Sequence, residues 1–135
     1  ILDIASLTSG ARLAFGSTAS AVASNDESFF NDLLEASRSS GEKIWRIPMF
    51  EEYREPITTD IADLANTGEG PKMMNAVMFL KEFTENLPWL HIDIAGTCWA
   101  EKSSSYTCEG GRGTGSRLLF SLMEKRVRGR EGSGT

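Results

Sequence analysis

The apolar residues of this chain gather in short runs that are typical of strands. Ile1–Ala5 is a compact apolar run followed by a polar loop through Gly10. Ile44–Pro48 alternates briefly and ends at proline, and Leu90–Gly96 is the longest such run. A further short strand is expected near Ala19–Ala23. The pattern therefore predicts three or four short strands.

Between these runs the apolar residues return at helical spacing. The clearest helix is expected to be capped by Ser24 or Asn25 and to end at Gly41, with acidic residues in its first turn. A second helix should begin at Pro71 and run to about Asn86, apolar over much of its girth and so buried. The remaining expectations are one or two turns over Phe50–Arg54, closed before Pro56, and a last amphipathic helix over Leu118–Val127.

Alternating strands and helices favour an α/β fold, a three-layer α/β/α arrangement with a mostly parallel central sheet. In such sheets, ligands bind beyond the carboxyl ends of the strands. The loops after Ala5 and after Ala95 are therefore the first places to expect a site.

Composition narrows the function classes. The chain has 135 residues, 14 Lys and Arg against 19 Asp and Glu, two cysteines and one histidine. A net charge of -5 argues against a nucleic-acid partner, because phosphate binding needs concentrated positive charge. No apolar run is long enough to span a membrane. Two cysteines cannot form a disulfide scaffold, and one histidine argues against His-rich zinc sites.

Two acids lie inside otherwise apolar strands, Asp3 and Asp93. Such a carboxylate is costly to bury unless it is paired or hydrogen-bonded. It could serve as a metal ligand or an acid-base group. The favoured interpretation is a structural carboxylate that accepts hydrogen bonds from neighbouring backbone N–H groups.

Other candidates favour structural interpretations as well. Asp60 and Asp63 would share a helical face and could hold a cation, but turn capping is preferred because further oxygen ligands are lacking. His91 is expected to be a satisfied core or interface residue. The stretch Gly110–Gly115 could present N–H groups to an anion, but it matches no phosphate-binding motif and reads better as a flexible loop. Neither Cys98 nor Cys108 carries the marks of a nucleophile. Residue types and spacing alone thus predict no complete catalytic set.

The order of several longer motifs nevertheless resembles a known family. The opening ILDIASLT is similar to the "IDIATLTG" strand and loop of leucine aminopeptidases, also called cytosol aminopeptidases. The segments SNDESFFNDLLEASRSSGEKIWRIPMFEEYRE, DIADLANTG, FLKEF, PWLHIDIAGT and RLLFSL follow in the family's order. Six ordered matches over about 125 residues identify the chain as resembling this family along nearly its whole length.

The resemblance implies a metal-dependent exopeptidase that removes N-terminal amino acids from peptides with two bridged divalent metals, Zn or Mn. In the family, two ligands and a catalytic arginine lie in "N-T-D-A-E-G-R", upstream of the "IDIATLTG" strand, and the other ligands and a catalytic lysine lie earlier still. No metal ligand or catalytic residue can be assigned to this chain, whose sequence opens on the apolar run at Ile1. We therefore expect residues 1–128 to be the C-terminal part of a catalytic domain, inactive alone, with 129–135 as a flexible tail.

What the resemblance does transfer is one wall of the substrate pocket. Ser6, Leu7, Thr8 and Ser9 match the family's "T-L-T-G" loop, and two further lining positions correspond to Ala95 and Cys98. Ser9 replaces a glycine, and GEGPKMMNA departs from the family's "R-x-[GA]-G" helix start. These departures motivate an alternative, a degenerate relative with a structural or binding role. A third alternative is a gene fragment that does not fold alone.

The resemblance also implies partners and location. It predicts a peptide N-terminus as substrate, a homo-oligomer (a hexamer in the family), and a cytoplasmic protein without nucleic-acid or membrane partners. No metal is expected to bind this chain alone.

Overall fold

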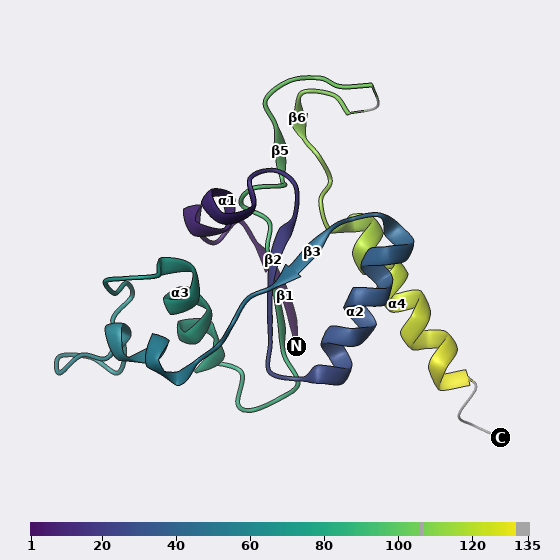
Figure 1. Ribbon diagram of the computed structural model, residues 1–135. Coiled ribbons are helices and arrows are strands. Elements are labelled where there is room, and N and C mark those ends of the chain that lie inside the picture. The colour runs from purple at the N-terminus through teal and green to yellow at the C-terminus, as the bar shows by residue number, and fades with distance from the viewer. Residues whose placement is uncertain (106, 132–135) are drawn as a thin grey trace.

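The computed structural model describes residues 1–105 and 107–131. It contains strands, α-helices and one 3₁₀ helix in alternation along the chain (Figure 1). In chain order these are β1 (Leu2–Ala5), α1 (Ser9–Phe15), β2 (Ser20–Ser24), α2 (Glu27–Ser40), β3 (Ile44–Arg46), η1 (Glu51–Ile57), α3 (Lys72–Lys81), β4 (Leu90–Asp93), β5 (Trp99–Ala100), β6 (Gly110–Gly111) and α4 (Ser116–Glu131).

The central sheet has the strand order β1-β4-β2-β3. β1 runs parallel to β4, with Leu2 opposite Leu90, and β2 runs parallel to β3. Only the middle pair, β2 and β4, is antiparallel. The expected mostly parallel sheet is therefore confirmed. A separate two-stranded hairpin, β5 and β6, projects from the sheet (Figure 1).

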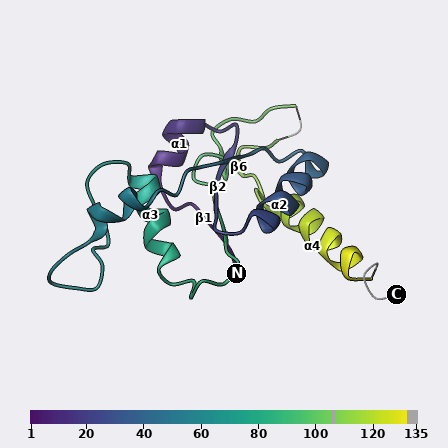
Figure 2. The same ribbon diagram turned by 60° about the horizontal axis from the view of Figure 1, so that its bottom comes forward.

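Helices cover both faces of this sheet, which gives the expected three layers (Figures 1 and 2). One face bears Val22, Leu90 and Ile92, and they pack with apolar residues of α2 and α4. The opposite face bears Ala21, Ala23 and Trp89, which pack with residues of α1 and α3. Strand side chains alternate between faces, so a short run can serve both cores only when nearly every position is apolar.

The helix α2 begins one residue later than the sequence suggested. Its cap is Asp26, whose carboxylate accepts a 2.6 Å hydrogen bond from the Phe29 N–H. Ser24 lies two residues before the cap. Its hydroxyl accepts from the Asp26 N–H at 3.1 Å and donates to the Trp89 carbonyl at 2.7 Å. The predicted end at Gly41 is confirmed, and its φ of 74° is the left-handed conformation that glycine adopts without strain.

Three other segments differ from expectation. The helix α1 was not predicted, because its small residues show little periodicity. Pro56 lies inside η1, which continues to the buried Ile57 rather than closing before the proline. The helix α3 ends at Lys81 instead of Asn86, since positive φ angles at Glu85 (51°) and Asn86 (59°) are incompatible with a continuing right-handed helix.

Both ends of α3 also need a correction. Pro71 is the residue before the first helical position, not the first position itself. Phe83, expected to be buried, lies past the helix and is 65% exposed. At the other end of the chain, α4 includes residues 129–131, which we expected in the tail, and the rest of that tail lies outside the described residues.

Candidate functional site

Two loops emerge side by side from the carboxyl ends of β1 and β4. Because these strands are parallel neighbours, Ser6–Ser9 and Ile94–Cys98 leave the same edge of the sheet. The Ile94 N–H donates to the Ala5 carbonyl at 2.9 Å, which extends the strand pairing into the loops. These are the two loops in which the sequence predicted a site.

A single carboxylate ties the loops together. Asp93 is almost wholly buried, and its oxygens accept hydrogen bonds from the N–H groups of Leu7 (3.2 Å), Thr8 (3.0 Å) and Ala95 (3.0 Å). The Thr8 hydroxyl also donates to Asp93 at 2.8 Å, while the same oxygen caps α1 by accepting from the Ala11 N–H. The interpretation of Asp93 as a structural carboxylate that accepts hydrogen bonds from backbone N–H groups is therefore confirmed.

The loop conformation also depends on a close backbone approach. A Cβ atom on Gly96 would stand 2.0 Å from the Gly16 carbonyl oxygen and 3.2 Å from the Cα of Arg12. Such distances are far inside van der Waals contact, so glycine is required where the β4 loop passes α1.

The six predicted pocket residues differ in exposure. Ser6, Leu7 and Ser9 are exposed, whereas Thr8, Ala95 and Cys98 are half-buried. Asp93 brings Leu7, Thr8 and Ala95 to one point. The Cys98 N–H donates to the Ile94 carbonyl at 2.9 Å, which closes a turn in the loop after β4. Three surface cavities among the described residues, of about 420 to 620 Å³, are lined by other side chains. The role of the six predicted pocket residues in binding a substrate stays a prediction.

The second strand acid has side-chain partners. Asp3 accepts hydrogen bonds from the Trp89 indole at 2.6 Å, and its other oxygen lies 2.5 Å from His91 Nδ1. Burial alone would raise the pKa of Asp3, but the hydrogen bonds from His91 and Trp89 outweigh it, and the pKa stands below its ordinary value. The expected backbone N–H partners are thus replaced here by two ring N–H groups.

His91 is a core residue of β4. Its ring is fully buried, and Nδ1 meets Asp3. Nε2 is buried without a hydrogen-bond partner among the described residues, so the expectation of a fully satisfied histidine holds for one ring nitrogen only.

The remaining candidates do not converge. Residues 60–64 form bends and not a helix, so Asp60 and Asp63 share no helical face, and both are exposed. Cys98 and Cys108 are free thiols. Within residues 1–105 and 107–131, no three His, Cys, Asp or Glu side chains are grouped closely enough to hold a metal ion. The two-metal centre implied by the resemblance therefore does not fit the donors that the described chain presents.

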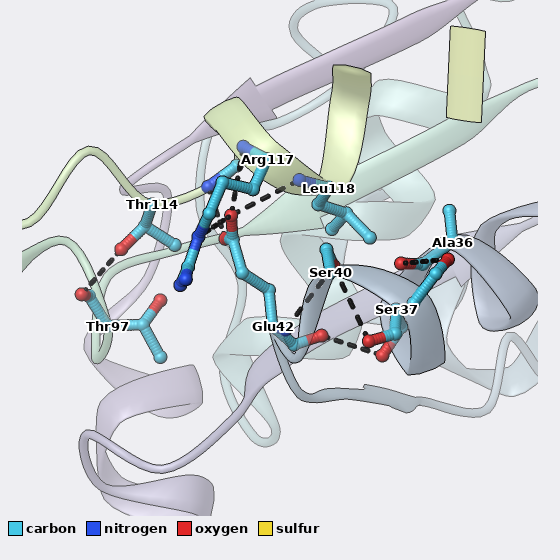
Figure 3. A network of polar contacts seen from close by, with 10 residues as sticks. Ala36, Ser37, Ser40, Glu42, Thr97, Thr114, Arg117 and Leu118 are labelled. Atoms are coloured by element: carbon cyan, nitrogen blue, oxygen red, sulfur yellow. Dashed lines mark hydrogen bonds and ion pairs between the residues drawn. The ribbon is translucent and has the colours of Figure 1, made fainter. Parts of the chain in front are cut away.

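Backbone N–H groups at the end of the glycine-rich stretch and in the first turn of α4 do bind an anion. That anion is the side-chain carboxylate of Glu42. The Glu42 carboxylate accepts from the N–H groups of Gly115 (2.6 Å), Arg117 (3.1 Å) and Leu118 (3.2 Å) at the start of α4 (Figure 3). A carboxylate at a helix N-terminus is favourable because unpaired N–H groups and the helix dipole both attract negative charge. Sequence reasoning missed Glu42, which lies 73 residues from its first partner.

With this geometry established, comparison with known proteins defines the class. A family model described as "Cytosol aminopeptidase family, catalytic domain" matches residues 1–120. The chain is 42% identical over 129 residues to a probable cytosol aminopeptidase of Clostridium perfringens, and the match covers 95% of this chain and 26% of the relative. It is 43% identical over 125 residues to a probable cytosol aminopeptidase of Alkaliphilus oremlandii, covering 92% and 25%.

Solved structures agree. A mutant of tomato leucine aminopeptidase superposes with a TM-score of 0.85 at 32% identity, over 93% of this chain and 24% of that one. The bottromycin maturation enzyme BotP, solved in complex with Mn, superposes with a TM-score of 0.86 at 29% identity, over 93% and 28%.

The fold is thus that of the leucine aminopeptidases, a three-layer α/β arrangement around a mostly parallel sheet. The chain belongs to the cytosol aminopeptidase family. It spans about a quarter of the length of the curated relatives that it matches. In the described part of the chain, no helix is both long and apolar enough to cross a bilayer.

Proposed function

We propose that residues 1–128 act as the C-terminal part of a leucine aminopeptidase-like catalytic domain and contribute one wall of the pocket for a peptide N-terminus. The observation that carries this proposal is the family match over residues 1–120 in a chain whose described residues contain no metal-holding group. The part assigned to this chain is accordingly substrate positioning, and the metal ligands are assigned to residues outside it.

The geometry at Asp93 supports such a wall. Asp93 uses the N–H groups of Leu7, Thr8 and Ala95, which fixes the two loops against each other. The side chains of Ser6, Leu7 and Ser9 stay exposed at the same edge of the sheet. A rigid frame that presents a few outward side chains suits substrate orientation, because little ordering is left to the moment of binding.

On this proposal the 135-residue chain should be inactive alone. The purified chain, supplied with Zn²⁺ or Mn²⁺, is expected to hydrolyse leucine p-nitroanilide no faster than a mock preparation from host cells without the gene. Hydrolysis above that background, in proportion to chain concentration, would contradict the proposal that this chain positions substrate and does not supply the metal ligands.

The competing proposal is that the chain belongs to a non-catalytic relative. It rests on two departures from the family pattern, Ser9 and the altered start of α3. Ser9 is the first residue of α1 and is exposed, while the next residue, Gly10, packs so closely on α3 that a Cβ there would lie 2.9 Å from the Met73 Cβ. The departures thus lie beside or at the contact between α1 and α3, because Ser9 precedes Gly10 and Met73 belongs to the altered segment.

A chimaera separates the two proposals. Residues 1–128 would replace the matching quarter of the Clostridium perfringens relative, and a second chimaera would carry Ser9→Gly in addition. We expect leucine p-nitroanilide hydrolysis in both, within about tenfold of each other in kcat/KM, since 1.4 kcal/mol of binding energy is tenfold. Activity only in the Ser9→Gly chimaera, or in neither although both are folded by circular dichroism, would favour the non-catalytic relative.

The same resemblance supports a proposal about the assembled protein. We expect it to be a cytoplasmic homo-oligomer that acts on peptide N-termini and holds two divalent metals, Zn or Mn. Light scattering of the active chimaera would test the assembly, with a hexamer as the expected size and a monomer as the contradicting result.

A further inference from the structure

A polar cavity of about 620 Å³ lies where four separate segments meet. Its walls come from the turn before β2, the turn between α2 and β3, the loop after β4, and the hairpin segment that leads through β6 to α4. The hydroxyl groups of its inner wall already have hydrogen-bond partners. The Ser20 and Thr97 hydroxyl oxygens are 2.7 Å apart. The Thr114 hydroxyl donates to the Thr97 backbone carbonyl at 2.7 Å (Figure 3). The inner wall is therefore a fixed surface.

Three cationic side chains line this cavity, Lys43, Arg112 and Arg117. Glu42 is the only acid among the lining residues, and its oxygens are held by the three N–H groups at the start of α4. A chain with a net charge of -5 thus concentrates positive charge at one hollow. This concentration is local, and the general acidity of the surface does not predict it.

The cations keep most of their hydrogen-bonding capacity. Lys43 has no ion-pair partner in residues 1–105 and 107–131, and Arg112 makes one long hydrogen bond, 3.4 Å, to the Ser17 carbonyl. Arg117 lies 3.7 Å from Glu42 with its side chain 75% exposed, which is a weak surface pair. Its guanidinium extends along the Thr114 and Thr97 side of the Glu42 carboxylate (Figure 3).

We propose that this cavity, which we call the cationic cavity, binds a small polyanion through its phosphate or carboxylate oxygens. Arginine forks and a lysine ammonium are the groups that bind such oxygens most strongly. The volume falls within the range of small-molecule sites, about 300 to 1,000 Å³, and exceeds what one phosphate group needs. Two or more anionic groups on one molecule would meet the three cations together.

The first test is a calorimetric titration of the 135-residue chain with pyrophosphate and, separately, with citrate. We expect saturable binding with one site for at least one of them, and the stronger of the two tells phosphate from carboxylate preference. The Lys43→Gln/Arg112→Gln variant should bind at least about tenfold more weakly, because two charge-assisted contacts are removed. The matched control is Arg38→Gln/Lys72→Gln, which removes the same charge from exposed positions outside the cavity and should bind like the wild type.

A second pair of variants keeps all three cations. Gly111 lines the cavity, and a Cβ there would meet nothing within 4 Å, so side chains are accommodated. Gly111→Asp should weaken binding by at least about tenfold through charge repulsion, whereas Gly111→Ser should bind within about threefold of the wild type. The comparison remains informative if the double variant does not fold.

Cys108 provides a local reporter, since it is exposed and lines the same cavity, whereas Cys98 does not. Saturating ligand should slow carbamidomethylation of Cys108 by iodoacetamide and leave the rate at Cys98 unchanged, as read by peptide mass spectrometry. The absence of saturable binding, equal weakening in the Arg38→Gln/Lys72→Gln control, or a wild-type affinity in Gly111→Asp would each overturn the proposal.

Discussion

Two carboxylates perform the same task in different parts of this molecule. Asp93 joins the loops after β1 and β4, and Glu42 joins the turn between α2 and β3 to the start of α4. Each accepts hydrogen bonds from three backbone N–H groups. All three are distant in sequence for Glu42, and two of the three, those of Leu7 and Thr8, are distant for Asp93. They differ in setting, because Asp93 is almost wholly buried within the sheet and also accepts the Thr8 hydroxyl, whereas Glu42 lies at the margin of a polar cavity.

The difference shows when the structural role of an acid can be predicted from the sequence. Asp93 stands in an apolar strand, where an unsatisfied carboxylate would be costly, so its need for donors is evident from its neighbours alone. Glu42 follows Gly41 after a helix, a position at which exposed acids are common. Its partners are defined only by the packing of α4 beside α2.

The largest effect is expected from Asp93→Ala. Four donors lose a buried acceptor, and the two candidate site loops lose their link. We expect the free energy of unfolding to fall by about 3 kcal/mol, the usual cost of breaking a buried charged network. Urea denaturation followed by circular dichroism would measure this. The matched control is Asp60→Ala at an exposed bend, which should change stability by less than about 0.5 kcal/mol. A fall below about 1 kcal/mol for Asp93→Ala would mean that the junction contributes little.

A smaller effect is expected from Glu42→Ala. Three N–H groups lose their acceptor, but water in the adjacent cavity can replace it, so the expected loss is about 1 to 2 kcal/mol. The same urea experiment applies, with the exposed Glu52→Ala as control. A loss equal to that of Asp93→Ala would contradict the expectation that the buried Asp93 stabilises the fold more than Glu42, which lies at the margin of the cavity.

The smallest effect is expected from Asp3→Asn, and it depends on pH. The folded-state pKa of Asp3 lies below its ordinary value of 3.8, so its ionised form adds stability above that pH and loses it as the pH falls through the folded-state pKa. Its side chain is 39% exposed, which limits the contribution to about 1 kcal/mol or less.

The readout for Asp3→Asn is the urea midpoint at about pH 6 and at about pH 3. The gap between wild type and variant should be largest at about pH 6 and should narrow as the pH falls toward the folded-state pKa of Asp3, because protonation removes the charge that asparagine lacks. A gap that is constant or wider at low pH would contradict the proposed role of the Asp3 charge.

Much of the fold could be predicted because it rests on local signals. The runs at Ile1–Ala5, Ile44–Pro48 and Leu90–Gly96 correspond to β1, β3 and β4, and Gly41 ends α2 as expected. The failures have physical causes. α1 is built from small residues with little periodicity. α3 stops at Lys81, and the chain then makes tighter i→i−3 hydrogen bonds at residues 82–84 before the positive φ angles at Glu85 and Asn86.

The candidate site was only partly predictable. The resemblance placed Ser6–Ser9, Ala95 and Cys98 on one wall, and parallel pairing does bring their loops to one edge. No residue type could reveal that Asp93 would hold both loops, that His91 would direct Nδ1 at Asp3 and bury Nε2 without a partner, or that three cations would line one cavity.

By itself, the sequence determined the kinds of elements, their order, the α/β class and the family, because apolar spacing, helix-ending residues and ordered motifs act over short distances. Tertiary structure alone decided which polar groups meet. Hydrogen bonds and cavities form between segments some 70 to 90 residues apart, as at Glu42 with Gly115 and Asp93 with Leu7, and only the packed layers set those distances.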